Sequence, residues 1–551
     1  MDIHTLSRLG RFKDIAVALV SYGFGDLISR LDLPERFLRL IPRKSQYTHL
    51  DAWKRLRLVL TELGPTFIKF GQLLSLRSDL LPLELTTELS KLQDDVPPEK
   101  FENIRARIEA ELEVPLEDVF LEFEDTPIAA ASLAQVHRAL LKKDRTVVAV
   151  KVQRPGIKRT ITYDLDILAG FARQLHERIE TLSVYNLPQL IRELRKLMLQ
   201  ELDFEREARN MRLAWANFKD EEYLSLPRVI NEYTTSRVLT MELIQGIPLK
   251  DFLEKPLEDR QALARNGIRA ALKQILKDGF FHADPHPGNI IIQNDKVLYL
   301  LDWGMVGRLT PDTRSKLITL LEAVVDRDSE IVLNMLLLFS HHSSYMNRDQ
   351  LQRDILDIMD DYYSVPLSEI NIGQLLNALT NLLFEHKIRM KSDLAIMVRA
   401  IVASEGSARL LYPDLDVVSE AEPYLRKIAL EKLSPSYLKR ILRKEFSKFL
   451  QLNREVPMRF NQILGKMEND QLSIGFEHRN LDEMRSTIDR VANRITLGIL
   501  TAAMIIGSSM IITTGVRPFL FGYPALGLIG FLLSGCIGFW LIIDILRKRK
   551  R

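Results

Sequence analysis

Cysteine is nearly absent from this chain, since Cys536 is the only one among 551 residues. A single thiol cannot form an internal disulfide and leaves no cysteine-based zinc site, which fits a reducing compartment. An excess of charge of one sign is also missing, because 76 lysines and arginines are balanced by 73 aspartates and glutamates. That balance supplies no overall field for binding a phosphate backbone, so we expect no nucleic-acid partner. The sequence shows no internal repeat, and its length predicts several ordinary globular domains.

Charged residues are also missing from two long stretches near the C-terminus, Ile495 to Val516 and Pro518 to Ile543, which only Arg517 separates. Each stretch reaches the roughly 20 apolar residues that cross a bilayer. The stretches predict a transmembrane helical hairpin, and a pair of buried core helices is the alternative. By the positive-inside rule, the flanking basic residues place the soluble domain on the cytoplasmic side of the cell inner (plasma) membrane. These basic residues are Arg490, Arg494 and the run Arg547, Lys548, Arg549, Lys550 and Arg551.

The N-terminal residues lack the features of an export signal. Met1 to Val20 carries two aspartates and has neither a clean apolar core nor a small-residue cleavage site. It therefore matches neither a secretory signal nor an acid-poor transit peptide. From Ile15 to Leu31 the apolar residues follow a helical spacing, which indicates either a packing helix, the interpretation we favour, or a helix on a membrane surface.

Secondary-structure patterns change along the chain and predict an α+β protein. Helical patterns dominate both the N-terminal and the C-terminal parts, and a break is expected at Gly64-Pro65. One continuous helix is expected from Leu187 to Phe218. The expected strands are Val119–Phe123, Ala134–Leu141, Thr146–Gln153, Arg228–Asn231, Ser236–Leu243, Ile290–Gln293 and Val297–Leu301.

The segment His282-Ala283-Asp284-Pro285-His286-Pro287-Gly288-Asn289 precedes a strand pair that ends in Leu301-Asp302-Trp303-Gly304. Asp284 stands five residues before Asn289, and Asn289 stands thirteen before Asp302. This is the spacing of a protein-kinase-like catalytic loop and metal loop. Phosphoryl transfer requires a carboxylate near the phosphates, an amide that ligates Mg²⁺ and a second Mg²⁺ carboxylate. We therefore predict Asp284 as a catalytic residue, and Asn289 and Asp302 as metal ligands.

Two other interpretations of this segment are weighed against the first. His282, Asp284 and His286 alternate as the ligands of a metallohydrolase do on a strand. A tight proline and glycine turn stabilised by an aspartate would carry no chemistry. The prolines at 285 and 287 and the downstream Asp-x-Gly favour the kinase-like interpretation.

Upstream, Val147 to Lys151 has the pattern of a buried strand and ends in the lysine that holds the α- and β-phosphates in kinases. A lone lysine at a strand end is usually solvated, so this role needs a carboxylate partner, and Glu207 on the following long helix is the candidate. We predict Lys151 and Glu207 as catalytic residues, with Lys151 also binding the nucleotide.

Two further segments are expected to contact the nucleotide. A strand ends just before Gly246, as a hinge that binds adenine through its backbone would. Where a glycine-rich loop should cover the phosphates, the chain has alanines, whose Cβ atoms restrict positive-φ geometry and should alter the approach of the nucleotide. The predicted binding residues are Met241, Glu242 and Ile244 in the hinge, and Ala129, Ala130, Ala131, Ser132 and Gln135 in the alanine-rich loop.

Other features depart from ordinary protein kinases. Ala283 replaces the arginine of the catalytic loop, and no Ala-Pro-Glu follows Asp302. The stretch between Lys151 and Glu207 is long enough to contain an extra helix pair. These departures argue against a peptide-binding activation segment.

The chain resembles the UbiB family, atypical protein-kinase-like proteins linked to ubiquinone and other isoprenoid-quinone biosynthesis, in its bacterial form with a C-terminal hairpin. The family's Lys-x-Gly-Gln signature is Lys69-Phe70-Gly71-Gln72, and its Glu-x-Asp signature is Glu201-Leu202-Asp203. With the alanine-rich loop and the catalytic and metal loops, the similarity runs from Leu60 to Arg308 in the family's order. Trp303 replaces the commoner phenylalanine, which puts the local packing of the metal loop in question.

The resemblance implies a two-lobed protein-kinase-like fold whose N-terminal helical extension lies across the active site. Lys69 and Gln72 would meet Glu201 and Asp203 there, a regulatory contact in the place of a protein substrate. We accordingly expect a helical extension (1–118), a kinase-like N-lobe with inserted helices (119–243), a helical C-lobe (244–435), a helical linker (436–494) and two transmembrane helices (495–545).

The resemblance also implies binding of ATP or ADP with Mg²⁺, weak or absent protein-kinase activity, and a lipid-responsive ATPase. Membrane lipids and isoprenoid-quinone precursors are the expected partners, and other quinone-biosynthesis proteins and a homodimer are left open. A protein or small-molecule kinase and a non-catalytic, nucleotide-dependent scaffold of a quinone-biosynthesis complex are the alternatives. A hydroxylase role finds no flavin or nicotinamide motif and no evident iron site.

Overall fold

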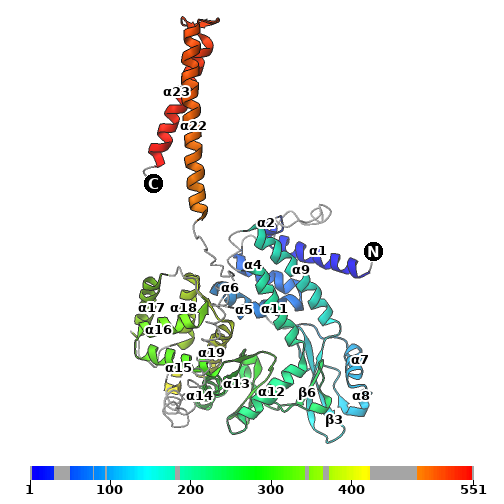
Figure 1. Ribbon diagram of the computed structural model, residues 1–551. Coiled ribbons are helices and arrows are strands. Elements are labelled where there is room, and N and C mark those ends of the chain that lie inside the picture. The colour runs from blue at the N-terminus through cyan, green and yellow to red at the C-terminus, as the bar shows by residue number, and fades with distance from the viewer. Residues whose placement is uncertain are drawn as a thin grey trace, which may run out of the picture. The chain divides into compact units, whose positions relative to one another are not determined.

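The computed structural model describes residues 3–29, 47, 50–77, 80–92, 96–179, 186–341, 347–363, 371–417, 419–421 and 481–548. It divides into two compact units, residues 1–438 and 439–551. Figure 1 shows that the larger unit combines helices and sheets, which confirms the predicted α+β kinase-like architecture. Most of the predicted linker, together with residues 549–551, lies outside the described residues.

The N-lobe is built on an antiparallel sheet of order β1-β3-β4-β6, with β2 added to β3. In β4 the side chains of Val148, Val150 and Val152 are fully buried in the core of this lobe. Because side chains alternate along a strand, Lys151 faces the opposite side of the sheet. The strands are β1 (Phe120–Phe123), β2 (Ala129–Ala130), β3 (Ala134–Leu141), β4 (Val147–Gln153) and β6 (Val238–Glu242), and helices α7 (Phe101–Leu112) and α8 (Leu116–Val119) pack on the core face.

Two sequence expectations in this lobe are wrong. The strand expected at Arg228–Asn231 is reduced to an isolated bridge between Val229 and Met241, followed by the 3₁₀ turn η1 (Asn231–Tyr233). The long helix expected from Leu187 to Phe218 is divided into α11 (Leu187–Glu201) and α12 (Phe204–Phe218). The division lies at Asp203, whose side chain accepts a hydrogen bond from the backbone N–H of Arg206 and so begins a new helix.

The N-terminal extension packs with α11 and α9 into one hydrophobic core. In α1 the side chains of Ile15, Ala16 and Ala18 are buried, and Arg11 forms a 2.8 Å ion pair with Asp164 of α9. The described part of the stretch from Ile15 is therefore a packing helix, and the membrane-surface alternative finds no support. These helices are α1 (Ile3–Ser21), α2 (Gly25–Ser29), α4 (Ala52–Leu63), α5 (Pro65–Ser75), α6 (Leu83–Leu89) and α9 (Ile157–Arg178).

The C-lobe is mainly helical and carries two small sheets that present the catalytic and metal loops. One has the order β5-β10-β9-β7, and the other pairs β8 with β11. The predicted pair β9 and β10 is confirmed, and Asn294 and Asp295 in its three-residue connection both have a positive φ, which asparagine and aspartate adopt more readily than most residues. The strands are β5 (Leu224–Ser225), β7 (Ile247–Pro248), β8 (Phe280–His282), β9 (Ile290–Gln293), β10 (Val297–Leu300), β11 (Val306–Arg308), β12 (Ser340–His341) and β13 (Arg389–Met390).

The helices of the C-lobe share two hydrophobic cores, one around the catalytic loop and one farther along the chain. The π-helix η2 continues α14 and leads into β8, and the 3₁₀ turn η3 leads into β9. The elements are α13 (Leu249–Phe252), α14 (Leu257–Leu272), η2 (Lys273–Asp278), η3 (Pro287–Asn289), α15 (Pro311–Val325), α16 (Ser329–Leu338), α17 (Arg348–Tyr363), α18 (Ile372–Glu385) and α19 (Ser392–Leu411).

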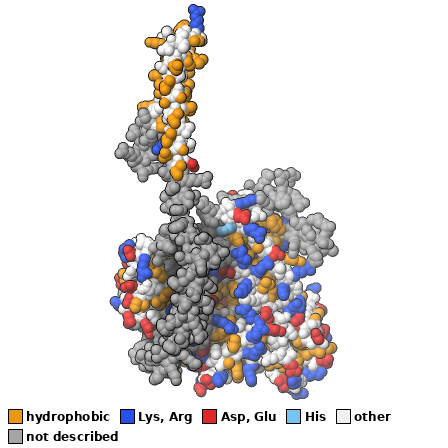
Figure 2. Space-filling model, in the orientation of Figure 1, with side chains coloured by type: hydrophobic (Ala, Val, Ile, Leu, Met, Phe, Trp, Pro, Cys, Tyr) orange, Lys and Arg blue, Asp and Glu red, His pale blue; other side chains and the backbone are white. Residues whose placement is uncertain are grey.

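The C-terminal unit is a hairpin of α22 (Leu481–Thr514) and α23 (Ala525–Lys548), joined by β14 (Phe519–Leu520) and β15 (Tyr523–Pro524). Among the residues that the structure describes, one helical segment, Val491–Thr514, is long and apolar enough to cross a membrane, and Ala525–Leu541 is a shorter apolar segment. Figure 2 shows this unit covered mostly by hydrophobic side chains on the visible face, whereas the larger unit mixes them with charged ones. The second helix begins at Ala525 rather than at Pro518, because the paired strands β14 and β15 take up the intervening residues.

Small residues lie where the two hairpin helices meet. A Cβ added to Gly527 would lie 2.7 Å from Cγ1 of Ile512 and 2.9 Å from the backbone oxygen of Ser508. Small residues let helix backbones approach closely in membrane proteins. We therefore expect Gly527→Leu to separate the helices, whereas Gly535→Leu, which would meet nothing within 4 Å, should be tolerated.

Distances between spin labels at Ile499 and Phe539, measured by electron paramagnetic resonance in lipid nanodiscs, test this expectation. Both side chains are exposed in the hairpin. The distance distribution should lengthen and broaden in Gly527→Leu only. An unchanged distribution in that variant would contradict the close packing at Gly527.

Candidate active site

The catalytic loop follows β8 and is held by His282. The backbone N–H of Asp284 donates to Nδ1 of His282 at 3.1 Å, so Nε2 carries the hydrogen and donates to the backbone oxygen of Leu301 at 2.8 Å. Burial lowers the pKa of His282, which agrees with a neutral ring. The histidine thus connects the catalytic loop to the residue just before Asp302.

This geometry excludes the metallohydrolase interpretation of the segment. Both ring nitrogens of His282 are used in hydrogen bonds to the backbone, and Nδ1 of His286 accepts from the N–H of Gly288 at 3.0 Å. Among the residues that the structure describes, no group of three His, Cys, Asp or Glu side chains is arranged to hold a metal. Mg²⁺ needs fewer protein ligands, because it binds through one or two carboxylates together with phosphate oxygens.

Asn289 is positioned by the catalytic loop itself. Its side-chain amide nitrogen donates to the backbone oxygen of Asp284 at 3.2 Å. This hydrogen bond uses the amide nitrogen, so the amide oxygen, the atom that ligates hard cations, stays available for a ligand. The catalytic loop therefore fits the predicted metal-binding role of Asn289.

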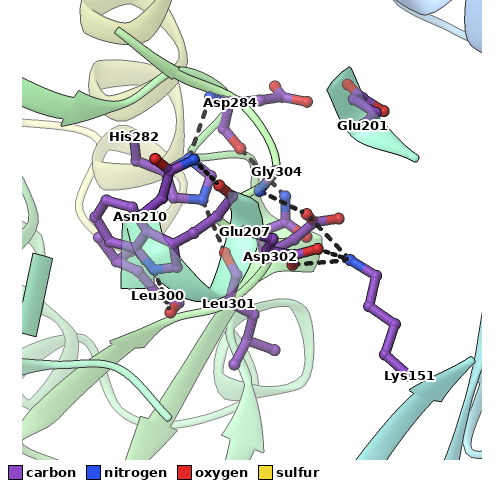
Figure 3. Close-up of polar contacts among 12 residues, drawn as sticks. Lys151, Glu201, Glu207, Asn210, His282, Asp284, Leu300, Leu301, Asp302 and Gly304 are labelled. Atoms are coloured by element: carbon purple, nitrogen blue, oxygen red, sulfur yellow. Dashed lines mark hydrogen bonds and ion pairs between the residues drawn. The ribbon is translucent and has the colours of Figure 1, made fainter. Parts of the chain in front are cut away.

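The metal loop is fixed by Trp303, whose side chain is fully buried. Its indole N–H donates to the backbone oxygen of Leu300 at 3.1 Å, and its own backbone oxygen accepts from the amide of Asn210 on α12 at 3.0 Å. Asp302 has a left-handed φ of 47° and accepts a 3.2 Å hydrogen bond from the N–H of Gly304. Figure 3 shows these contacts around the loop, with Asp302 turned toward Lys151. The tryptophan is accommodated without displacing the loop from the site.

Lys151 forms the ion pair that the sequence predicts. Its Nζ lies 2.8 and 2.9 Å from the two carboxylate oxygens of Glu207 and 3.4 Å from Oδ1 of Asp302 (Figure 3). Burial lowers the pKa of Lys151, but Asp302 and Glu207 outweigh it, so the pKa lies above its ordinary value. Burial raises the pKa of Glu207 to about 7 against the effect of Lys151. The lysine therefore keeps its charge, while the glutamate is the group that titrates near neutrality.

Asp302 also remains ionised, because nearby lysines outweigh the effect of burial on its pKa. About half of its side chain, 49%, faces open space, in contrast to the 3% of Glu207. Burial raises the pKa of Asp302, but Lys151 and Lys69 outweigh this effect and hold the pKa well below its ordinary value. A charged carboxylate is therefore available where a divalent cation would be held.

The N-terminal extension contributes Lys69 and Gln72 from α5. Nζ of Lys69 lies 2.6 Å from Oε2 of Glu201, and the amide of Gln72 donates to the backbone oxygen of Leu92 at 3.2 Å. Burial raises the pKa of Glu201, and Lys69 opposes that effect. Contrary to the expectation, Asp203 does not join this contact. Its carboxylate caps α12 and pairs with Arg209 at 3.3 Å.

All of these elements enclose one cavity of about 770 Å³ between the lobes. This volume suits a nucleotide-sized ligand. The predicted residues that line it are Lys69, Gln72, Ala129, Ala131, Lys151, Glu201, Glu207, Met241, Glu242, Ile244, Asp284, Asn289 and Asp302. Their roles stay predictions, but the structure brings them together.

Four predicted residues are not among those that line the cavity: Ala130, Ser132, Gln135 and Asp203. Gln135 is fully buried, accepts from the backbone N–H of Glu99 at 2.8 Å and lies 2.7 Å from Nε2 of His137. Ser132 is also buried. The alanine-rich segment forms the short strand β2, and alternation along it turns Ala130 away from the side of Ala129 and Ala131.

Sequence reasoning missed Arg399 of α19, which also lines the cavity. It lies 115 positions after Asp284, so no local spacing connects the two residues. A signal was present, because Arg399 is the only charged residue in the apolar run from Ala395 to Ala403. A lone charge in such a run is either paired or functional.

Comparisons with known proteins agree with this geometry. Residues 91–336 match the ABC1 atypical kinase-like domain, residues 355–416 the UbiB helical domain, and residues 479–547 the ABC1/UbiB kinase-like C-terminal domain. An uncharacterised protein from the hydrogenase 1 5′ region of Clostridium pasteurianum is 33% identical, over 98% of this chain and 99% of its own length. A protein of Marinobacter nauticus named "Probable protein kinase UbiB" is 33% identical, over 83% of this chain and 86% of its own length.

A solved structure is similar at lower identity. The Mycobacterium tuberculosis protein Rv3197, in complex with erythromycin, is 21% identical with a TM-score of 0.47, over 64% of this chain and 90% of its own.

Proposed function

Because the chain belongs to the ABC1/UbiB family of kinase-like proteins, we propose that it binds ATP with Mg²⁺ and hydrolyses it in support of ubiquinone or other isoprenoid-quinone biosynthesis. The observation that carries the proposal is that Lys151, Asp284, Asn289 and Asp302 line a single cavity. These are the residue types that phosphoryl transfer requires, at kinase-like positions.

Each residue has a defined part in this proposal. Lys151, held by both oxygens of Glu207, would bind the α- and β-phosphates. Asn289 and Asp302 fit Mg²⁺, because they present an amide oxygen and a carboxylate whose pKa lies below its ordinary value. Bound Mg²⁺ would neutralise charge that develops on the phosphates. Asp284 would orient the attacking oxygen and accept its proton or stabilise its charge.

Water is the acceptor that the cavity wall favours. Helix α5 lines the cavity through Lys69, Gln72 and Ser75, and its Lys69 is paired with Glu201. A protein substrate would have to displace this helix, whereas a water molecule would not. Adenosine triphosphate would then be cleaved to the diphosphate and inorganic phosphate.

The C-terminal hairpin supports a membrane location. Val491–Thr514 is long and apolar enough to span a bilayer, and large apolar side chains such as those of Ile499 and Met510 are exposed on it. Exposed apolar surface on this scale costs free energy in water and is stabilised by lipid. The hairpin would hold the soluble domain, on the cytoplasmic side, close to polyprenylated precursors, which are themselves dissolved in the membrane.

A phosphate-release assay on the purified full chain tests the function. Nanodiscs of neutral lipid, nanodiscs that contain anionic lipid, and either type with a phenolic quinone precursor are compared. Release of inorganic phosphate that increases with anionic lipid or precursor is the expected result. Transfer of labelled phosphate to an added acceptor would instead indicate a kinase, and nucleotide binding without any release would indicate a scaffold.

The pKa of Glu207 leads to a prediction on pH. A protonated Glu207 cannot hold Lys151 as an ion pair, so the affinity for Mg²⁺-ATP should fall as the pH is lowered through about 7. Titration calorimetry across this range measures the effect. In the variant Glu207→Gln the side chain at position 207 is neutral at every pH. Its binding profile therefore reports the pH dependence that comes from titration of the nucleotide itself. Identical pH profiles for the two proteins would contradict the assignment.

A further inference from the structure

Arg399 lines the cavity as a partly buried residue, and one of its guanidinium nitrogens has no hydrogen-bond partner. Its Nη1 donates to the backbone oxygen of Ser75 at 2.9 Å. Its Nε is buried and has no hydrogen-bond partner. Burial of a charged donor without a partner costs free energy. An anion bound in the cavity would place a counter-charge beside this guanidinium.

The position of Arg399 is set by rigid contacts on both sides. On the same helix, the hydroxyl of Ser407 donates to the backbone oxygen of Pro285 in the catalytic loop at 3.0 Å. Arg399 precedes Ser407 by eight residues, so it lies about 12 Å closer to the N-terminal end of α19. At the other side, its bond to Ser75 attaches it to the C-terminal end of α5. The guanidinium is therefore positioned before any ligand binds.

Arg399 and Asp284 both line the cavity. Burial lowers the pKa of Arg399, and the carboxylate of Asp284 opposes that effect. The catalytic loop has no arginine of its own, because Ala283 occupies that place and is buried. Lys151 reaches the cavity from the N-lobe, on strand β4. Lys151 and Arg399 thus reach the cavity from opposite lobes, and Arg399 comes from the lobe that carries Asp284.

We propose that Arg399 binds the terminal phosphate of the nucleotide and supplies from α19 the positive charge that the catalytic loop lacks. The inference rests on the proposed function and adds a catalytic residue to it. Guanidinium N–H groups match phosphate oxygens in pairs, and cations that contact the transferred phosphoryl group stabilise charge in the transition state. A residue at this position distinguishes ATP from ADP, because only ATP presents the terminal group.

The test compares a non-hydrolysable ATP analogue with ADP, both with Mg²⁺, on the full chain in nanodiscs. We expect Arg399→Ala to weaken binding of the analogue by about 10- to 100-fold, the range of a hydrogen-bonded charge pair, and to leave ADP binding unchanged. Arg399→Lys keeps the positive charge but loses the paired hydrogen-bond geometry. Its affinity for the analogue should therefore lie between those of the unaltered protein and Arg399→Ala. Arg353→Ala removes an exposed arginine from α17 and is the matched control.

Each other outcome overturns a defined claim. Equal weakening of both nucleotides would show that Arg399 only holds α5 in place, and unchanged binding would show that it contacts neither nucleotide; both would overturn the inference alone. Failure of the unaltered protein to bind any nucleotide would overturn the proposed function and the inference with it. If Arg399→Ala does not fold, the ratio of the two affinities in Arg399→Lys decides the question.

Discussion

Asp302→Asn is expected to abolish Mg²⁺-dependent ATP turnover, with a fall in kcat of about 1000-fold, the size of several kcal/mol of lost charge stabilisation. The carboxylate is ionised because Lys151 and Lys69 hold its pKa below the ordinary value. The amide has the same shape, and its oxygen can still accept from the N–H of Gly304. The substitution therefore removes the charge and keeps the loop geometry.

Phosphate release from the purified variant, measured over a range of Mg²⁺ concentrations, gives the result. Asp295→Asn is a suitable control, because Asp295 is exposed in the β9–β10 turn and its left-handed conformation is one that asparagine adopts readily. Turnover in Asp302→Asn equal to that of the control would remove the metal assignment. Loss of turnover in both would point to a general loss of folding.

Trp303→Ala is expected to destabilise the kinase-like unit by about 3 to 5 kcal/mol, the cost of truncating a large buried aromatic residue. The side chain packs between Phe280, with ring centroids 6.0 Å apart, and Phe218, at 5.8 Å, and edge-on to His282 at 5.0 Å. Its removal would leave a void at the point where α12, the catalytic loop and the metal loop meet.

Urea unfolding of the full chain in detergent micelles, followed by far-ultraviolet circular dichroism, measures this loss. Trp303→Phe retains an aromatic ring and should lose much less. We also expect Trp303→Ala to weaken Mg²⁺-nucleotide binding, because the strained backbone of Asp302, at φ 47°, depends on its neighbour for support. An unfolding midpoint equal to that of the unaltered protein would contradict the role of Trp303 as the anchor of the metal loop.

Much of the site could be predicted because its parts lie close together in the sequence. Asp284, Asn289 and Asp302 occupy one loop and one short hairpin, so their relative positions follow from local geometry and spacing. Lys151 could be placed from the alternation of β4, since valines on the core face turn the lysine to the other side. The pairing with Glu207 followed from the cost of leaving a partly buried lysine without a counter-charge.

Predictions were wrong where a polar side chain served a neighbouring backbone instead of the site. Asp203 caps the helix that it begins, which also breaks the long helix expected there. Gln135 is fully buried and hydrogen-bonded to the segment before α7. In both cases the residue type permits either use, and the choice depends on which backbone groups lie nearby.

The sequence by itself determined which residue types stand at kinase-like spacing, because candidate metal-binding and phosphate-binding groups are recognisable by type and by short spacing. The tertiary structure alone decided what surrounds that chemistry. It brought Ser75 and Arg399, 324 positions apart, into contact at the cavity. Such contacts depend on how whole helices pack, and packing is set by the summed burial of many apolar side chains rather than by any local pattern.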